Sequence, residues 1–382
     1  MRRELERIEI PGEHDARART WETVRAAYEE REPVSRARRF VRPVLVAAAA
    51  AALVAAAASP PGRAVIGSVG DALGVSGADE SLFSLPDTGR LLVVSDGGAW
   101  TVDADGSKRR LGGYDDASWS PFGRFVVAAR GSELAALETD GDVRWKLSRP
   151  DVRRPRWGGS RTDTRIAYLS GDELRVVGGD GRGDRRLVSS VDPAAPAWRP
   201  ATFHFLAYAK GGRVFVGDAE GRRTFWSRRI GTVLGLDWSP DGELLLVRGP
   251  RSLRVFDQAG TLRFELLAGP SAAPVTAAAF SPSGRGVAFV QQTRGRSHVW
   301  LISRLRPDAG AARELFSGPG SFTDLSWSPS GRWLLVAWRD PNQWLFLSTA
   351  GGRRVRAVAN VAGQFESRRF PDVKGWVADE AP

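Results

Sequence analysis

The sequence lacks several motifs of catalytic and nucleotide-binding sites, and this limits the reactions that the chain could catalyse. Its nearest approach to the G-x-S-x-G nucleophile turn of serine hydrolases is Gly74-Val-Ser76-Gly-Ala78, which ends in alanine. Gly179, Gly181 and Gly183 are spaced like glycines of nucleotide-binding loops, but they fall where the repeats of the chain predict a hairpin turn. The tripeptide Arg182-Gly183-Asp184 belongs to the same turn, so we infer no adhesion function from it. These patterns predict neither a hydrolase nor a nucleotide-binding site.

Metal and redox chemistry are restricted in the same way. The 382 residues include no cysteine and three scattered histidines, His14, His204 and His298. This composition excludes disulfides, thiolate metal sites and cysteine nucleophiles, and it argues against imidazole-based sites. The turn Asp103-Ala-Asp-Gly106 could begin a calcium loop, but tyrosine stands at position 114, where such a loop needs its closing glutamate. We therefore expect no catalytic residue, no metal and no cofactor.

A repeat organises the chain from about residue 81. The clearest copies are Trp119-Ser-Pro-Phe-Gly123, Trp238-Ser-Pro-Asp-Gly242, Phe280-Ser-Pro-Ser-Gly284 and Trp327-Ser-Pro-Ser-Gly331. Weaker copies begin at Phe83, Trp157 and Trp198, so successive aromatic residues stand 36 to 47 residues apart. This is the period of a four-stranded propeller blade. The aromatic residues are expected to pack between neighbouring blades, which makes the tryptophan-rich composition mainly structural.

One repeat shows how the residues specify a blade. The strands expected from apolar runs are Val233–Trp238, Glu243–Val247, Ser252–Phe256 and Leu262–Leu267. Between the first two, proline and glycine of Ser239-Pro-Asp-Gly242 supply the fixed and the positive φ angles of a tight turn. The segment Asp257-Gln-Ala-Gly260 supplies a second turn. Each repeat therefore predicts four antiparallel strands joined by short loops.

These repeats resemble those of TolB-type and related WD-like β-propellers, over roughly residues 81–376. The resemblance implies an all-β fold and a role as a binding platform in the bacterial envelope, although some similar propellers form the lids of prolyl oligopeptidases. Seven aromatic residues favour seven blades, with six as the alternative. The C-terminal stretch Gln364 to Trp376 is expected to supply the strand that closes the ring and protects its edges.

An apolar segment precedes the propeller. Residues Val44 to Ala58 are fifteen consecutive Val, Leu or Ala residues, preceded by four arginines from position 36 onward without an acid. The segment is shorter than the roughly 20 residues of a typical membrane span, but its flanks follow the positive-inside rule. We expect an uncleaved signal anchor over residues 43–59, with residues 60–80 as a linker. A cleaved signal peptide ending near Ala58 and a buried helix are the alternatives.

The residues before the anchor form a unit of their own. No Gly or Pro interrupts residues 13–32, and Trp21, Val24 and Tyr28 fall on one face of the expected helix. A single helix with one apolar stripe cannot form a core, so it needs a partner surface or a membrane. We expect residues 1–42 to be cytoplasmic and this helix to bind a protein partner. A partly ordered charged tail explains the same residues equally well.

Positive charge is the remaining signal. The net charge is +11, and 51 of the 55 basic residues are arginine, which a G+C-rich coding bias would also produce. The loops between second and third strands share a face with the blade-to-blade crossings, and they include Arg248, Arg251 and Arg294. We expect these three to bind an acidic protein segment or an anionic envelope polymer, unless they are merely solvated loops. Nucleic acid is not expected, because this face would lie outside the cell.

Together these patterns predict a single-pass membrane protein with a cytoplasmic N-terminus and an extracytoplasmic β-propeller over residues 81–382. Its expected function is non-enzymatic binding of a protein or ligand, as an envelope sensor or regulator. The alternative is a propeller hydrolase or lyase that uses carboxylates and arginines in the central channel. Carboxyl groups with strongly raised pKa values in that channel would favour the alternative.

Overall fold

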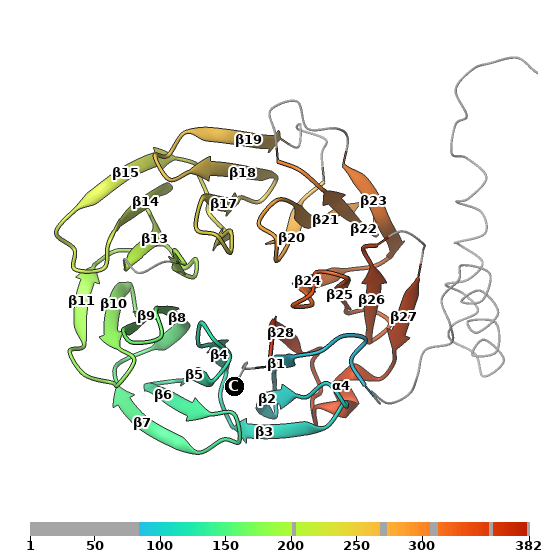
Figure 1. The fold of residues 1–382 in the computed structure, drawn as a ribbon, viewed down its shortest axis with the longest axis horizontal. Helices are drawn as coiled ribbons and strands as arrows, with labels where there is room; N and C mark the ends of the chain where they lie inside the picture. The colour runs from blue at the N-terminus through green and yellow to red at the C-terminus, as the bar shows by residue number, and fades with distance from the viewer. Residues whose placement is uncertain (1–83, 201–203, 268–272, 306–311, 351–353, 380–382) are drawn as a thin grey trace, which may run out of the picture. The chain divides into compact units, whose positions relative to one another are not determined.

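The computed structural model describes residues 84–200, 204–267, 273–305, 312–350 and 354–379. The chain divides into two compact units, residues 1–63 and 64–382, and the first unit lies entirely outside the described residues. The second unit contains seven four-stranded antiparallel sheets, which Figure 1 shows arranged as blades around a central axis. The prediction of a seven-bladed all-β propeller is confirmed. The expected anchor and N-terminal helix lie outside the described residues.

Blades 1 to 4 each have four strands, named in order from the channel outward. Blade 1 contains β28 (Asp372–Val377), β1 (Arg90–Ser95), β2 (Gly98–Val102) and β3 (Lys108–Gly112). Blade 2 contains β4 (Asp116–Trp119), β5 (Phe125–Arg130), β6 (Glu133–Glu138) and β7 (Val143–Ser148). Blade 3 contains β8 (Val152–Gly159), β9 (Thr164–Ser170), β10 (Glu173–Gly178) and β11 (Arg185–Val188). Blade 4 contains β12 (Ala197–Trp198), β13 (Phe205–Lys210), β14 (Arg213–Asp218) and β15 (Thr224–Arg229).

The other three blades follow the same order. Blade 5 contains β16 (Gly235–Trp238), β17 (Leu244–Arg248), β18 (Ser252–Asp257) and β19 (Leu262–Leu267). Blade 6 contains β20 (Val275–Phe280), β21 (Val287–Thr293), β22 (Arg296–Ile302) and β23 (Arg313–Pro319). Blade 7 contains β24 (Phe322–Trp327), β25 (Trp333–Trp338), β26 (Gln343–Ser348) and β27 (Val355–Val358). A short helix, α4 (Val361–Gln364), precedes β28. No helix among the described residues is long and apolar enough to cross a membrane.

The ring closes by pairing the two ends of the propeller. Strand β28 is the inner strand of blade 1 and pairs antiparallel with β1, for example Leu91 with Trp376. The predicted closure by the C-terminal stretch is therefore confirmed. The aromatic residue of the blade 1 inner strand is Trp376, whereas the repeat spacing assigned that position to Phe83, which lies outside the described residues. The indole Nε1 of Trp376 donates a hydrogen bond to Thr88 O at 3.1 Å.

In the blades that contain it, the Ser-Pro-x-Gly turn joins the inner strand to the second strand. In blade 5, Gly242 adopts φ 71°, and its N–H donates to Ser239 O at 2.8 Å. The Ser239 hydroxyl, fully buried, accepts the N–H of Leu244 at 2.9 Å. Ser328 accepts the N–H of Trp333 in the same way, at 3.1 Å. Serine and glycine thus satisfy the backbone at the turn, which explains why this motif recurs.

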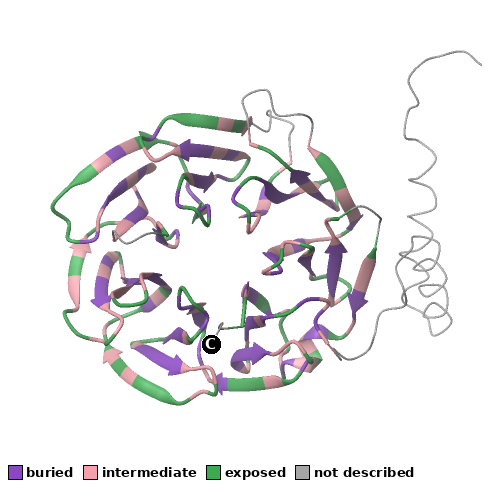
Figure 2. Cartoon of the chain, in the orientation of Figure 1, coloured by how far each residue is buried: buried purple, intermediate pink, exposed green. Residues whose placement is uncertain are grey.

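The core lies in the middle strands and between blades. Figure 2 shows that the outermost strands are largely exposed or intermediate, whereas the strands inside them are largely buried. Tryptophans of the inner strands join neighbouring blades by donating Nε1 to a carbonyl of the preceding blade. These bonds are Trp119 to Gly375 at 3.3 Å, Trp198 to Arg156 at 2.9 Å and Trp327 to Ala279 at 3.3 Å. The expected packing of the aromatic residues between blades is confirmed for these positions.

Candidate functional site: the central channel

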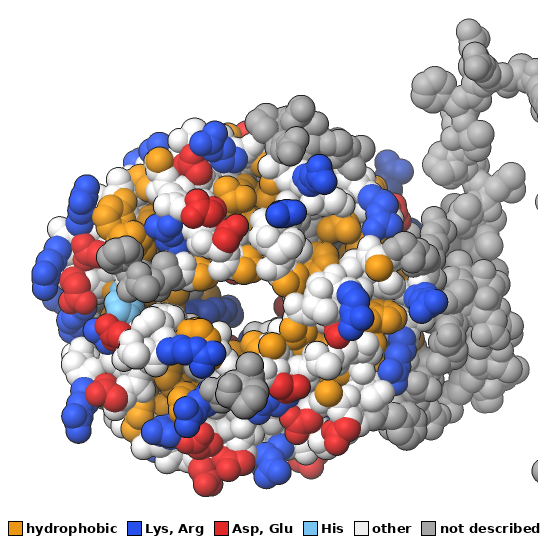
Figure 3. All heavy atoms as spheres, in the orientation of Figure 1, with side chains coloured by type: hydrophobic (Ala, Val, Ile, Leu, Met, Phe, Trp, Pro, Cys, Tyr) orange, Lys and Arg blue, Asp and Glu red, His pale blue; other side chains and the backbone are white. Residues whose placement is uncertain are grey.

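Charged residues from the inner strands gather around the central channel. We call this group the channel belt, and it consists of Asp116, Arg154, Arg156, Asp237, Asp324, Asp372 and Lys374. We infer that these side chains face the channel, since charged groups on non-adjacent blades influence one another. Arg156 on blade 3, for instance, acts electrostatically on Asp237 of blade 5. Figure 3 shows the opening through the ring.

Lys374 organises one side of the channel belt. Its Nζ lies 3.2 Å from Asp116 Oδ1 and 3.3 Å from Asp372 Oδ2. Asp116 Oδ2 also accepts the backbone N–H of Arg154 at 3.2 Å. Burial opposes the ionisation of Asp116, but the charges of Lys374 and the nearby arginines outweigh it and lower the pKa of this carboxyl. This side of the channel is therefore an ion-paired structural element.

Two other carboxyl groups of the channel belt have less compensation. Asp237 and Asp324 line one cavity of about 150 Å³. Burial, reinforced by the negative charge of Asp372, raises the pKa of Asp324 to about 7. Asp237 is exposed to the channel, but protein encloses that channel on its sides, and this enclosure raises the pKa of Asp237 to about 6. Two carboxyl groups of this cavity thus titrate near neutral pH.

The arginine in the same cavity has a structural role. Arg248 donates from Nη1 to Val275 O and from Nη2 to Leu234 O, each at 3.2 Å. These bonds fasten the end of β17 to the crossing before β16 and to the inner strand of blade 6. Arg248 was expected, together with Arg251 and Arg294, on the face of the blade-to-blade crossings. It lies at the end of β17 beside the crossing residue Leu234, and it also lines the channel cavity.

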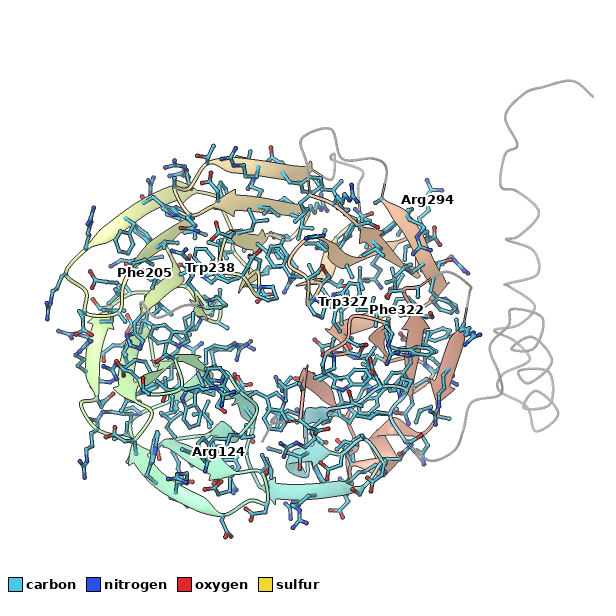
Figure 4. The ribbon with its side chains drawn as sticks, viewed as in Figure 1. Arg124, Phe205, Trp238, Arg294, Phe322 and Trp327 are labelled. Atoms are coloured by element: carbon cyan, nitrogen blue, oxygen red, sulfur yellow. The ribbon has the colours of Figure 1, made fainter. Side chains whose placement is uncertain are left out.

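The other expected binding residues lie elsewhere. Arg294 is exposed in the turn between β21 and β22, with φ 48°, and Figure 4 shows it toward the periphery of the ring. Arg251 is exposed in the loop between β17 and β18. Trp21, Val24 and Tyr28 lie outside the described residues. Arg248 is thus bound to backbone carbonyls, whereas the side chains of Arg251 and Arg294 are exposed.

An apolar rim surrounds the channel mouth on the face of the Ser-Pro-x-Gly turns. It is formed by Pro121, Phe122, Pro200, Pro240, Pro282, Pro329 and Val377, which line two adjoining cavities of about 690 and 630 Å³. Figure 3 shows hydrophobic side chains, in orange, gathered around the opening. Phe122 is 37% exposed, and contiguous exposed apolar patches mark interaction sites. The rim and the channel belt beneath it form an apolar entrance to a charged interior.

A signal for the channel belt exists in the sequence, although its grouping was not predicted. Asp116 and Asp324 each stand three residues before the inner-strand tryptophan of their blade, and Arg156 and Asp237 each stand one residue before it. Alternation along a strand places these positions on the same face. A charged residue at either position therefore marks the channel wall.

A pH dependence follows from Asp324. Because its folded pKa is above its unfolded value, the stability from its bound proton is complete below about pH 4 and is lost as the pH rises through about 7. Asp324→Asn, which cannot ionise, should therefore become more stable than the wild-type chain above about pH 7. Melting temperatures of both proteins between about pH 5 and pH 9 measure the effect. The exposed control Asp172→Asn should show no such trend, and a constant difference for Asp324→Asn would contradict the assignment.

Comparisons with known proteins agree with the fold. The architecture defines the class of the protein as a seven-bladed β-propeller. More particularly, residues 252–368, about a third of the chain, match the family described as the lipoprotein LpqB β-propeller domain. This segment runs from β18 through α4. The chain is therefore similar to LpqB-type propellers over its C-terminal blades. No curated protein shows a significant match to the chain.

Solved structures share the fold at low identity. The β-propeller domain of Cps50 (Swd1) from Myceliophteria thermophila is 19% identical, with a TM-score of 0.51, and the match covers 67% of this chain and 95% of that one. KlHsv2 with loop 6CD replaced by a Gly-Ser linker is 13% identical, with a TM-score of 0.52, covering 71% and 94%. At these identities the likeness establishes the propeller fold alone.

Proposed function

We propose that this chain is a membrane-anchored envelope protein whose propeller binds a segment of a partner at the apolar rim. The single observation that carries the proposal is the rim itself, an exposed apolar ring around an open, charged channel. Exposed apolar surface of this kind, with polar groups beside it, is typical of binding sites. The similarity of residues 252–368 to a lipoprotein propeller family supports placement in the envelope.

The arrangement of the remaining chain completes the proposal. Residues 1–42 are cytoplasmic, residues 43–59 form a single-pass anchor, and residues 60–80 link it to an extracytoplasmic propeller. The helix over residues 13–32 binds a cytoplasmic protein, which would make the chain a sensor or regulator. The arginine-rich sequence and the flanks of the apolar segment support this orientation. The partner on the outside is a protein segment, and an anionic envelope ligand is the other candidate.

The complete absence of cysteine gives a direct test. Single-cysteine variants Leu262→Cys, on the exposed outer strand β19, and Thr20→Cys report the two sides of the membrane. A membrane-impermeant maleimide should label position 262 in intact cells and position 20 only after permeabilisation. Labelling of position 20 in intact cells, or none of position 262, would overturn the orientation.

The same chemistry tests the rim. In Phe122→Cys, the thiol should react more slowly in cells than in purified protein, because a bound partner covers it. Leu262→Cys is the matched control, since Leu262 and Phe122 are both large exposed apolar residues of the propeller. Equal ratios of cellular to purified labelling rates at the two positions would show that nothing covers the rim.

The raised pKa values in the channel favour one second candidate, a hydrolase or lyase. Asp237 and Asp324 share a cavity and titrate near neutral pH, as a general acid and base pair requires. Against it, Arg248 in this cavity is bound to backbone carbonyls. The binding function therefore accounts for more of the site.

A further inference from the structure

A second cavity lies between blade 2 and blade 3, beside the rim but outside the channel. We call it the blade 2–blade 3 groove. It measures about 420 Å³ and is lined by residues of both blades, among them Phe125 and Trp145 of blade 2 and Trp157 of blade 3. Its volume falls within the usual range for small-molecule sites. The groove shares Pro121 and Phe122 with the rim, but its floor is made of other residues.

The floor of the groove is aromatic and fixed in place. The rings of Phe125 and Trp157 are stacked, with centroids 5.9 Å apart and planes 19° apart. Trp145 Nε1 donates to Gly179 O at 2.9 Å. The Trp145 ring lies so close to Gly181 that an added Cβ would come within 2.8 Å of it. The floor is therefore preorganised for a flat apolar group.

Arginines surround this floor. The guanidinium carbons of Arg124 and Arg144 lie 5.1 and 4.7 Å from the Phe125 ring centroid, and that of Arg161 lies 4.9 Å from the Phe122 ring centroid. Arg144 is paired with Glu138 at 2.5 Å. Among the described residues, Arg124 and Arg161 have no carboxylate within ion-pair distance. The groove thus presents two uncompensated guanidinium groups beside an apolar floor.

The equivalent aromatic residues between blades 4 and 5 are arranged differently. There Arg199, the residue after the inner-strand tryptophan, lies 5.6 Å from the Phe205 ring and 5.8 Å from the Trp238 ring. Its Nε donates to Gly242 O at 2.7 Å, so the chain covers these rings with its own side chain. Figure 4 labels Phe205 and Trp238 of blades 4 and 5 and Arg124 of blade 2.

In blade 2 the residue at the position of Arg199 is Ser120. Its hydroxyl is turned toward the N–H of Phe125, at 2.9 Å, and it is too short to cover the floor. The ring of Phe125 has Arg124 and Arg144 over it. Among the described residues, however, no arginine lies over Trp157, the counterpart of the Trp238 ring that Arg199 covers.

We propose that the blade 2–blade 3 groove binds an aromatic carboxylate, with its ring on the aromatic floor and its anionic group facing Arg124 and Arg161. Guanidinium groups suit this ligand, because they pair with carboxylates in a planar, two-point fashion and also stack on rings. Asp180 also lines the groove, but its Oδ1 accepts the N–H of Arg182 at 3.0 Å as part of a turn. It therefore leaves the two arginines available.

Calorimetry with three matched probes tests the proposal on the full chain in a nonionic detergent, with detergent-only titrations as blanks. Indole-3-acetate carries both ring and charge, indole-3-acetamide lacks the charge, and cyclohexylacetate lacks the aromatic ring. Indole-3-acetate should bind with a dissociation constant below about 1 mM, and the other two at least about tenfold more weakly. No binding of indole-3-acetate, or equal binding of the amide, would overturn the proposal.

Variants locate the binding. Arg124→Gln combined with Arg161→Gln should weaken indole-3-acetate binding by about tenfold or more. Both side chains are exposed, so the melting temperature should stay close to that of the wild type. The control Arg223→Gln removes an arginine that stacks on Phe225 at 5.2 Å in blade 4, and it should leave the affinity unchanged. Unaltered affinity in the double variant would place the ligand elsewhere and overturn the assignment, whatever the outcome at the rim.

Discussion

Deleting residues 364–382 should abolish cooperative folding of the propeller near room temperature. The deletion removes β28, the inner strand of blade 1, together with three buried side chains, Phe365, Val373 and Trp376. It also uncovers Leu91 and Val93 on β1, both fully buried in the intact ring. Removing one large buried aromatic residue costs about 3–5 kcal/mol. The combined loss is of the order of the whole stability of a typical domain, about 5–15 kcal/mol.

Urea unfolding followed by circular dichroism measures this effect. Truncation after Asp379, which removes only the last three residues and keeps β28, serves as the control and should unfold like the full chain. Trp376→Ala is a milder test of the same contact, because it removes one side chain and the hydrogen bond to Thr88 O. It should lower the free energy of unfolding by about 3–5 kcal/mol. A cooperative transition with unchanged midpoint after the long deletion would show that the ring does not need its C-terminal strand.

The sequence predicted this closure because its physical cause is local and visible. The first repeat leaves little room for a strand before Phe83, whereas the stretch Gln364 to Trp376 is additional to the seventh repeat. The repeat spacing assigned the inner-strand position of blade 1 to Phe83. The reason is that Phe83 is followed by serine, as the aromatic residues of the clearest repeats are. Blades 3 and 4, which lack the Ser-Pro-x-Gly turn, still form four strands, since alternation and hairpin turns are enough to specify them.

The sites were less predictable than the blades. The placement of Arg248 depends on a side chain that bends into the channel to bind two carbonyls of neighbouring segments, Leu234 and Val275. The raised pKa of Asp324 depends on its burial and on the charge of Asp372 in the closing strand β28. The open floor beside Phe125 depends on which residue follows each tryptophan. Such contacts join residues distant in sequence, so no local pattern reveals them.

Asp184 is a clear case of a residue whose role only the fold reveals. It is the aspartate of the Arg182-Gly183-Asp184 tripeptide, and its side chain is 5% exposed. Its Oδ1 accepts the Tyr168 hydroxyl at 2.5 Å, and its Oδ2 accepts Arg175 Nη2 at 2.6 Å and Arg149 Nε at 2.8 Å. The carboxylate therefore holds together β9, β10 and the crossing from blade 2, and it is not available to a receptor.

Replacing Asp184 by alanine should destabilise the propeller by about 3 kcal/mol, since it leaves the Tyr168 hydroxyl without its partner and leaves the Arg175 guanidinium with Glu173 alone. Arg175 is 15% exposed, so water can compensate it only in part. The matched control is Glu133→Ala, which breaks the exposed pair of Glu133 with Lys146 on the outer strands of blade 2. That loss should be within about 1 kcal/mol, as for other surface pairs. Chemical denaturation of the two variants and the wild type gives the comparison.

The pH dependence of the stability distinguishes the contribution of the Asp184 charge from that of side-chain packing. Burial opposes ionisation of Asp184, but hydrogen bonds from Arg175, Tyr168 and Arg149 outweigh it and lower the pKa of its carboxyl. A group with a lowered folded pKa stabilises the protein above its unfolded pKa and loses that effect as the pH falls through the folded value. The stability difference between wild type and Asp184→Asn should therefore be full at pH 7 and shrink below about pH 4. A difference that stays constant down to about pH 2.5 would mean that Asp184 acts through shape and neutral hydrogen bonds, and not through its charge.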